Sequence, residues 1–204
     1  YNNAGLIYRD FELTEEGYES MIAVNYFGSF RLALMLLENL HRRSGRIVQV
    51  TSFSMYLART FNLSGLHSKD SFSPSSRYNF TNLLRSMFAI ELENKLKKTS
   101  ISVSAAHPGV TKSRQSRPYE VKKIKKSFYT YFSTNINTGI APIIRAIEDE
   151  SITADLVYAP KLIGIYGEPA LMRHNKLVYN HELRDKLWSY TACLLYTSTS
   201  PRDE

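Results

Sequence analysis

The sequence contains a single cysteine, Cys193, among its 204 residues. One thiol cannot form a disulfide within the chain, so a reducing compartment is expected. The N-terminus shows no signal-peptide pattern, and the longest uninterrupted apolar run, Leu32–Leu37, is far shorter than a membrane span. Histidine, cysteine and carboxylate clusters with metal-ligand spacing are also absent from the sequence. These absences predict a cytoplasmic protein without a transmembrane span and without a metal site.

The composition is that of an ordinary globular domain, with 43% hydrophobic and 22% charged residues. Basic residues are unevenly spread: Lys112–Lys126 holds seven of them against one acidic residue, Glu120, and so carries six of the seven net positive charges. Because the rest of the chain is nearly neutral, we expect no nucleic-acid partner. A basic surface that binds nucleic acid or a membrane is the weaker alternative. The basic and aromatic stretch up to Asn135 would also suit a lid over a substrate cleft.

Predicted helices and strands alternate along the chain, which favours an α/β fold with a parallel sheet. Thr14 is placed to cap the first helix, and short β-branched segments are typical of strands buried on both faces. The expected order is a helix over Thr14–Leu40, a strand over Arg46–Ser52, a helix over Ser76–Leu92, a strand over Ile101–Ala106, a helix over Thr138–Glu150, a strand over Leu162–Tyr166 and a mixed, partly helical stretch over Ala170–Trp188.

The helix over Ser76–Leu92 carries the most informative residues. Its apolar positions recur at spacings of three and four, which predicts a broad buried stripe. Tyr78 stands near its start and shares one face with Thr81, Asn82 and Arg85, because residues three, four and seven apart are neighbours on a helix. Such a tyrosine is well placed for proton transfer in a cleft, although on this helix alone a packed tyrosine is the simpler interpretation.

Five short segments follow one another in an order that resembles the short-chain dehydrogenase/reductase family, and especially its retinol-dehydrogenase-like branch. Each segment alone is a weak signal, whereas their order and spacing together are specific. The segments are Asn2-Asn3-Ala4-Gly5, Val24-Asn25-Tyr26-Phe27-Gly28, the strand Gly45-Arg46-Ile47-Val48-Gln49-Val50-Thr51-Ser52, the helix with Tyr78, and His107-Pro108-Gly109-Val110 followed by Ser113.

The resemblance implies a doubly wound, Rossmann-like parallel sheet and an NAD- or NADP-dependent oxidoreductase that interconverts a small-molecule carbonyl and an alcohol. In this family a tyrosine exchanges a proton with the substrate oxygen while hydride moves to or from the nicotinamide. The choice of cofactor, the substrate and a homo-oligomeric state stay open. The implied catalytic residues are Asn25, Ser52, Tyr78 and Asn82, and the implied cofactor contacts are Asn2, Ala4, Gly5, Tyr78, Asn82, Pro108, Gly109, Val110 and Ser113.

Asn82 departs from the family pattern Tyr-x-x-x-Lys, because it stands where the family has lysine. Free tyrosine has a pKa of about 10, and a lysine four residues on favours its ionised form. Asparagine can hydrogen-bond a ribose hydroxyl but carries no charge. Arg85, on the same face, is long enough to lend positive potential, although a guanidinium differs in geometry from an ammonium. The alternative function is therefore a pseudoenzyme that binds a nucleotide and has lost turnover.

A second Tyr-x-x-x-Lys pattern occurs at Tyr119–Lys123. Chance accounts for one such pair in a chain of this composition. It also follows the Pro-Gly turn and lies in the basic segment, so we reject it as the catalytic pair.

The family's glycine-rich dinucleotide turn does not occur in this sequence, which is the second departure. We therefore expect an N-terminally truncated fragment in which the first half of the sheet is missing. Residues 1–190 would form the C-terminal part of one domain. Residues 191–204 resemble a translated cloning linker and are expected to be a non-native tail.

Simpler interpretations exist for four of the polar residues. Ser52 could cap a turn at the end of its strand, Asn25 could bond backbone at a helix kink, and Asn2 could only form a turn. His107 is interpreted as a buried, hydrogen-bonded histidine rather than a metal ligand.

Overall fold

The chain forms one sheet with helices on both faces. The computed structural model describes residues 1–42, 45–111 and 135–197. Neighbouring strands pair in the order β1-β2-β3-β4, with β1 parallel to β2, β2 parallel to β3, and β4 antiparallel to β3. The predicted α/β class is confirmed, with an antiparallel edge strand that the sequence analysis did not predict. The strands are β1 (Arg46–Val50), β2 (Ser102–Ala106), β3 (Leu156–Leu162) and β4 (Tyr166–Arg173).

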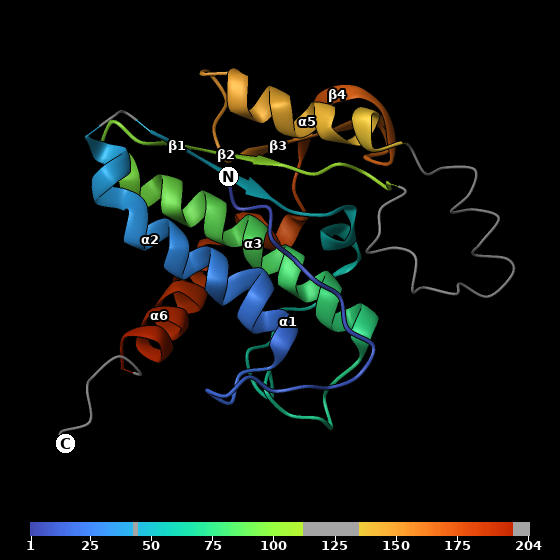
Figure 1. The fold of residues 1–204 in the computed structure, drawn as a ribbon, viewed down its shortest axis with the longest axis vertical. Helices are drawn as coiled ribbons and strands as arrows, with labels where there is room; N and C mark the ends of the chain where they lie inside the picture. Colours follow the sequence, from blue (N-terminus) through green and yellow to red (C-terminus); the bar gives the residue numbers. More distant parts are fainter. Residues whose placement is uncertain (43–44, 112–134, 198–204) are drawn as a thin grey trace, which may run out of the picture.

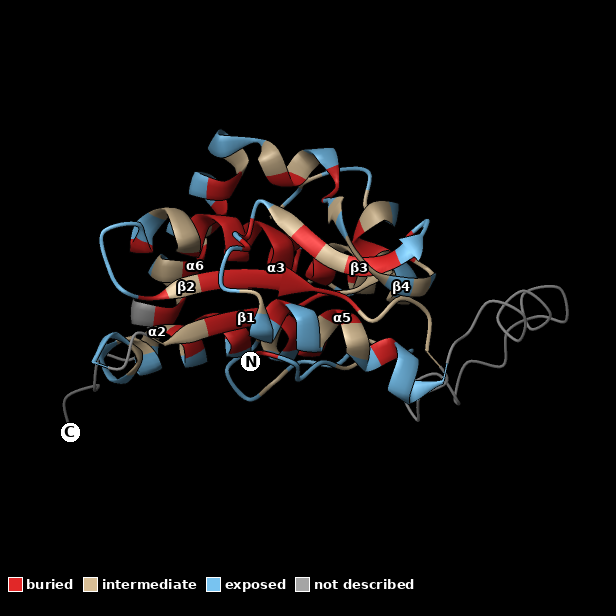
Figure 2. Cartoon of the chain, turned by 90° about the horizontal axis from the view of Figure 1, so that it is seen from above, coloured by how far each residue is buried: buried red, intermediate tan, exposed pale blue. Residues whose placement is uncertain are grey.

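Helices cover the two faces of the sheet unequally. Figure 1 shows α5 (Ile136–Glu148) alone on one side, and α2 (Gly28–His41), α3 (Pro74–Leu96) and α6 (His181–Thr197) on the other. The helix α3 is the central one, because every residue from Thr81 to Leu92 is buried. Figure 2 shows this burial together with that of β1 and β2, so the main core lies between α3 and the sheet.

The first long helix begins later than predicted. It consists of α1 (Ser20–Ile22), the π-helix η1 (Ala23–Phe27) and α2. The cap is Glu19, whose two carboxylate oxygens accept hydrogen bonds from the backbone N–H groups of residues 21 and 22, each at 3.0 Å. The predicted cap Thr14 is wrong: its hydroxyl oxygen accepts from the Tyr18 backbone N–H at 3.2 Å, within a turn before the helix.

The same helical segment, Ser20–His41, is long and apolar enough to cross a membrane by length and composition alone. An uninterrupted apolar run does not reveal it, because polar residues such as Asn25 and Arg31 divide its apolar residues. Half of the apolar window is buried inside the fold, as in a core helix of a globular protein. The absence of a transmembrane span therefore stays a prediction.

The predicted third strand over Leu162–Tyr166 is wrong, because Leu162 ends β3, Tyr166 begins β4, and the three residues between them form the turn. Ile163 and Gly164 have positive φ angles of 55° and 70°, which end the extended backbone. The strand β3 comes earlier and includes Pro160, which pairs with Pro169 of β4. Prolines weaken the sequence signal of a strand, so the short apolar stretch at the turn resembles a strand more than β3 itself does.

The C-terminal helix α6 continues past residue 190, the predicted domain boundary. The buried Thr191 hydroxyl lies 2.8 Å from the Tyr26 hydroxyl oxygen, and burial raises the pKa of Tyr26. The helix runs to Thr197, so the first residues of the predicted tail are helical and continue the fold. Whether residues 191–204 are non-native stays a prediction.

Candidate active site

The carboxyl ends of β1 and β2 bring two predicted segments to one edge of the sheet. Val50 is in register with Ala106, and the Thr51 backbone N–H donates to the Ala106 carbonyl at 2.8 Å. Ser52 and Pro108 follow these strands directly, and both are half-buried. This edge is where ligands bind in open α/β sheets.

Ser52 also caps a turn, as its simpler interpretation held. Its hydroxyl oxygen accepts a hydrogen bond from the Ser54 backbone N–H at 3.2 Å, at the start of the 3₁₀-helix η2 (Phe53–Leu57). A hydroxyl that accepts one bond can still donate another. The turn therefore holds the Ser52 oxygen in place without using its proton.

Tyr78 lies in the second turn of α3 and is half-buried. The strand end that carries Ser52 is tied to this part of α3, because the Thr51 hydroxyl donates to the Asn82 carbonyl at 2.9 Å. The motifs predicted that Ser52 and Tyr78 share one site. The bond from Thr51 joins the end of β1, which leads to Ser52, to the helix α3, which carries Tyr78.

Asn25 joins a third element to the same turn of α3. Its amide exchanges two bonds with the Leu6 backbone: Oδ1 accepts from the N–H at 2.7 Å, and Nδ2 donates to the carbonyl at 2.9 Å. Nδ2 also donates to the Thr81 hydroxyl at 3.1 Å, which in turn donates to the Tyr78 carbonyl at 2.9 Å. Asn25 lies in the π-helical turn η1, and such turns often occur at functional sites.

The side-chain amide of Asn82 bonds the backbone of its own helix, α3. Its Nδ2 donates to the Tyr78 carbonyl at 2.9 Å, and 2% of the residue is exposed. The sequence predicted that this amide could hydrogen-bond a cofactor ribose. In the structure the amide supports the Tyr78 turn, and it brings no charge there.

The segment Asn2–Gly5 lies beside β1. Asn2 pairs with this strand through its backbone, donating to the Val48 carbonyl at 2.8 Å and accepting from the Val50 N–H at 3.1 Å. Ala4 and Gly5 are exposed. A Cβ atom at Gly5 would lie 3.0 Å from Arg85 Nη1 and 3.5 Å from Asn25 Oδ1, so glycine leaves room for both side chains.

The predicted Pro-Gly turn follows β2. Gly109 has a φ of +72°, and a Cβ there would collide with the Ile165 carbonyl oxygen, so this position requires glycine. The Val110 N–H donates to the same carbonyl at 3.2 Å, which fixes the turn against the β3–β4 connection. Ser113, the last predicted cofactor contact, lies outside the described residues.

Contacts that sequence reasoning missed involve Leu6 and Gln49. Leu6 takes part through its backbone, for which a sequence gives no signal. Gln49 is fully buried in β1, next to the Asn2 side chain. A signal for it did exist, because a glutamine inside the apolar run Arg46–Val50 must find polar partners.

His107 is buried, as the sequence interpretation held. Its Nδ1 accepts from the Gly109 N–H at 3.2 Å, while Nε2 has no hydrogen-bond partner among the described residues. Burial, and then the nearby His174, lower the pKa of His107 to about 3. Burial likewise lowers the pKa of His174 to about 4, against the opposing hydrogen bond to the Ala154 carbonyl.

Because both histidines are buried in their neutral form, we expect the protein to lose stability in mild acid. The folded state keeps both rings neutral, whereas the unfolded chain binds protons below its ordinary histidine pKa of about 6.5. The free energy of unfolding should therefore fall as the pH drops from 6.5 towards 4, with a slope approaching about 1.4 kcal/mol per pH unit for each histidine. Urea unfolding at pH 7, 6 and 5 measures it.

In a His174→Gln variant the unfolding free energy should depend less steeply on pH, which would assign part of the loss to His174. His41 is exposed, so His41→Gln is the control and should leave the pH dependence unchanged. An unfolding free energy that does not change between pH 7 and pH 5 would contradict the prediction.

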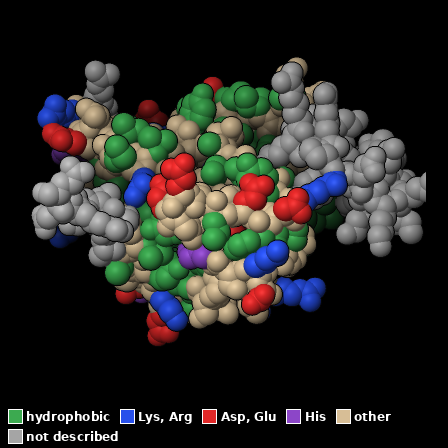
Figure 3. Space-filling view, turned by 60° about the horizontal axis from the view of Figure 1, so that its bottom comes forward, with side chains coloured by type: hydrophobic (Ala, Val, Ile, Leu, Met, Phe, Trp, Pro, Cys, Tyr) green, Lys and Arg blue, Asp and Glu red, His purple; other side chains and the backbone are tan. Residues whose placement is uncertain are grey.

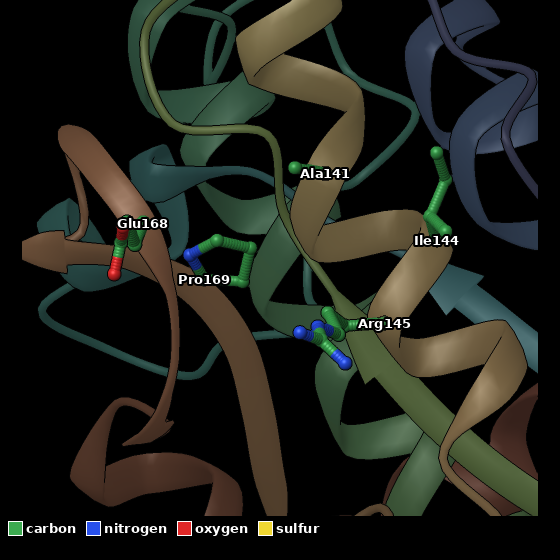
Figure 4. A pocket seen from close by; sticks show the side chains of 5 residues that line it. All are labelled: Ala141, Ile144, Arg145, Glu168 and Pro169. Atoms are coloured by element: carbon green, nitrogen blue, oxygen red, sulfur yellow. The ribbon is translucent and has the colours of Figure 1, made fainter.

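A pocket lies between α5 and β4, on the face of the sheet that is turned away from α3 (Figure 4). It contains none of the predicted site residues. The lining residues are Ala141, Ile144, Arg145, Glu168 and Pro169.

The predicted basic lid, Lys112–Asn135, lies outside the described residues except for Asn135, which caps α5. On the face drawn in Figure 3, acidic and basic side chains are interspersed, so this face offers no surface of a single charge. The weaker alternative of a nucleic-acid or membrane surface stays a prediction, because Lys112–Lys126 lies outside the described residues.

Comparisons with known proteins agree with the motifs. The sequence model of the short chain dehydrogenase family matches residues 1–123. Retinol dehydrogenase 14 of Homo sapiens is 29% identical over 166 residues, which cover 81% of this chain and 48% of that protein. The chain thus spans about half the length of this relative.

Solved structures show the same fold. An uncharacterized protein from Mycobacterium paratuberculosis matches with a TM-score of 0.72 at 23% identity, over 95% of this chain and 65% of that one. A gluconate 5-dehydrogenase from Burkholderia cenocepacia, in complex with NADP and tartrate, matches with a TM-score of 0.56 at 16% identity, over 72% and 55%. The four-stranded sheet is thus part of a Rossmann-like fold.

Proposed function

The chain belongs to the short chain dehydrogenase family, and on this premise we propose that the protein carrying it is an NAD(P)-dependent oxidoreductase that interconverts a carbonyl and an alcohol. One observation carries the proposal. Hydrogen bonds from Asn25 through Thr81, and from Thr51 to the Asn82 carbonyl, hold the Tyr78 turn against the two elements that carry Asn25 and Ser52. The backbone segments that carry these three predicted catalytic residues are thus bonded to one another, which supports the proposal.

The described residues fit one side of a dinucleotide site. Ala4 and Gly5 present exposed backbone beside β1, and the Pro108–Val110 turn presents half-exposed backbone after β2. These segments would hold the nicotinamide end, and the bound cofactor would supply or accept the hydride. The glycine-rich turn that would hold the phosphates is not among the 204 residues.

Each side chain has a separate task in this proposal. The Tyr78 hydroxyl gives a proton to the substrate oxygen in reduction and takes it back in oxidation. The Ser52 hydroxyl, fixed by its bond from the Ser54 N–H, donates to the same oxygen. Asn25 holds Leu6 and Thr81 and so keeps the first segment and α3 at a fixed separation. We also propose a cytoplasmic location, because a chain with a single cysteine cannot form an internal disulfide and suits a reducing compartment.

A second candidate function is a pseudoenzyme that binds the cofactor without turnover. The uncharged Asn82, whose amide donates within its own helix, is the observation that favours it. Cofactor binding without chemistry is what would separate this candidate from the enzyme.

Nicotinamide absorbance tests the proposal in the protein that carries this chain. The assay uses NAD(H) and NADP(H) in turn, against a panel of aldehydes, ketones and alcohols that includes retinal and retinol. We expect saturable turnover with at least one pair. Binding of a reduced cofactor, followed by its fluorescence, is measured alongside. Binding without turnover would favour the pseudoenzyme, and no binding by the folded protein would contradict both candidates.

A further inference from the structure

His107 is a fully buried histidine whose ring lies where three segments meet. It follows β2, and its backbone N–H donates to the Tyr158 carbonyl of β3 at 2.9 Å. The centroid of its ring lies 6.0 Å from that of Tyr56 in η2, which lies beside the end of β2 (Figure 1). On another side is Gly164, where a Cβ atom would lie 3.2 Å from Cε1 of the ring. These contacts leave the imidazole little room to move.

The two ring nitrogens of His107 have different surroundings. Nδ1 accepts a hydrogen bond from the Gly109 backbone N–H at 3.2 Å. Since the accepting nitrogen carries no proton, the neutral ring has its proton on Nε2. In the part of the chain that the structure describes, Nε2 has no acceptor. A buried donor without an acceptor is costly, and an apolar side chain of similar size would avoid that cost. The bond to Gly109 is therefore the interaction that favours histidine at this position.

Burial keeps His107 and its titratable neighbours uncharged. Burial, and then the nearby His174, lower the pKa of His107 to about 3. Burial lowers the pKa of His174 to about 4 and raises that of Tyr56 to about 12. At neutral pH the Nδ1 lone pair of His107 is thus available to the Gly109 N–H.

The bond from Gly109 sets the shape of the turn over Pro108–Val110. Pro108 has no N–H to donate, whereas the Gly109 N–H donates to His107 Nδ1 and the Val110 N–H to the Ile165 carbonyl at 3.2 Å. The bond to His107 spans two residues, as the side-chain bond of an Asx turn does. The turn is half-buried, and its accessible backbone is the part that the proposed function assigns to the cofactor.

We propose that His107 is a positioning residue, whose Nδ1 holds the Pro108–Val110 turn in the conformation that receives the nicotinamide end of the cofactor. It acts through the turn and touches neither substrate nor cofactor. The same ring packs against η2, which begins directly after Ser52, and so keeps the turn at a fixed distance from this serine. The effect on the cofactor rests on the proposed function, whereas the effect on the turn does not.

Hydrogen exchange of the Gly109 amide tests the effect on the turn without any cofactor. His107→Leu keeps a side chain of similar size but removes the acceptor, so this exchange should become about ten-fold faster, as expected for the loss of one hydrogen bond. His107→Asn returns an acceptor for the N–H two residues on, and should bring the exchange back close to that of the unaltered protein. His174→Gln removes another buried histidine and is the control, which should leave Gly109 exchange unchanged.

Cofactor affinity tests the effect on the site, in the protein that carries this chain. We expect the dissociation constant of the reduced cofactor, followed by its fluorescence, to rise by about ten-fold in His107→Leu and to recover in His107→Asn. At saturating cofactor, kcat should change less than the KM for the cofactor, because Tyr78 and Ser52 keep their hydroxyls. If His107 only filled space, the smaller asparagine would be the worse substitute, and no recovery would be seen.

The tautomer of His107 keeps the inference testable if His107→Leu fails to fold. The protein is labelled with ¹⁵N-histidine, and the His107 signals are identified by their loss in His107→Asn. At pH 7 we expect an unprotonated Nδ1 and a protonated Nε2. A proton on Nδ1 in the unaltered protein would overturn the inference.

The other outcomes are equally decisive. Unchanged Gly109 exchange in folded His107→Leu would overturn the inference, and so would a His107→Asn variant that behaves no better than His107→Leu. Faster exchange with an unchanged dissociation constant would refute the link to the cofactor. If the unaltered protein binds no cofactor, the proposed function fails, and Gly109 exchange still decides whether His107 holds the turn.

Discussion

Replacing Tyr78 with phenylalanine should lower kcat by about 100-fold to 10,000-fold, the range over which a positioned proton donor usually acts. The change removes only the hydroxyl, and the backbone carbonyl of residue 78 keeps its bonds from Thr81 and Asn82. Cofactor affinity and the cooperativity of unfolding should therefore stay close to those of the unaltered protein. Steady-state kinetics with the best substrate of the panel, together with cofactor fluorescence, measure both effects.

The matched control is Tyr119→Phe, which alters the second Tyr-x-x-x-Lys pattern of the sequence. It should retain the activity of the unaltered protein. A large loss of kcat in Tyr119→Phe, with Tyr78→Phe still active, would show that the wrong tyrosine has been assigned.

Glu19→Ala should cost about 3–5 kcal/mol of unfolding free energy, the usual effect of removing one partner of a buried ion pair. Glu19 is fully buried, and its carboxylate accepts from two backbone N–H groups at the start of α1 and lies 3.8 Å from Arg77 Nε. Alanine would leave these two donors without their acceptor and the buried guanidinium without its counter-charge. Urea denaturation at pH 7 measures the loss.

Glu38→Ala provides the comparison. Glu38 pairs with Arg42 on the surface of α2, with side chains that are 79% and 70% exposed, so its loss should cost less than about 1 kcal/mol. Adding Arg77→Met to Glu19→Ala should recover part of the stability, because the unpaired charge is then gone. Equal costs for the two glutamates would refute the argument.

The sequence was sufficient to predict the elements whose pattern reflects burial. The strands β1 and β2 are buried on both faces and appear in the sequence as short β-branched and apolar segments. The helix α3 is buried from Thr81 to Leu92, and its apolar residues recur at spacings of three and four. The β3–β4 hairpin was missed because its prolines and half-exposed positions blur such patterns. The start of α1 was not predicted correctly, because the buried Glu19 caps it. Thr14, five residues earlier, is a more typical capping residue and was predicted instead.

The candidate site was predicted as a set of residues but not as a network. Motif order indicated Asn25, Ser52 and Tyr78, whereas the bonds that join them pass through Leu6, Thr81 and the Asn82 carbonyl. These bonds connect segments 19 to 56 residues apart, and such separations depend on how the layers pack. The buried orientation of the Asn82 amide could not be predicted from the sequence either. An asparagine at this position could equally well direct its amide towards a ligand.

The π-helical turn at Asn25 makes this part of the chain sensitive to its length. Within it the Gly28 N–H donates to the Ala23 carbonyl, so the turn holds one residue more than an α-helical turn. Deleting one residue here would let the helix close regularly, but it would rotate the two halves by about 100° relative to each other. Either Asn25 would then lose Leu6 or the buried Phe30 would leave the core. Homologous sequences should therefore vary here by substitution, while insertions and deletions fall elsewhere.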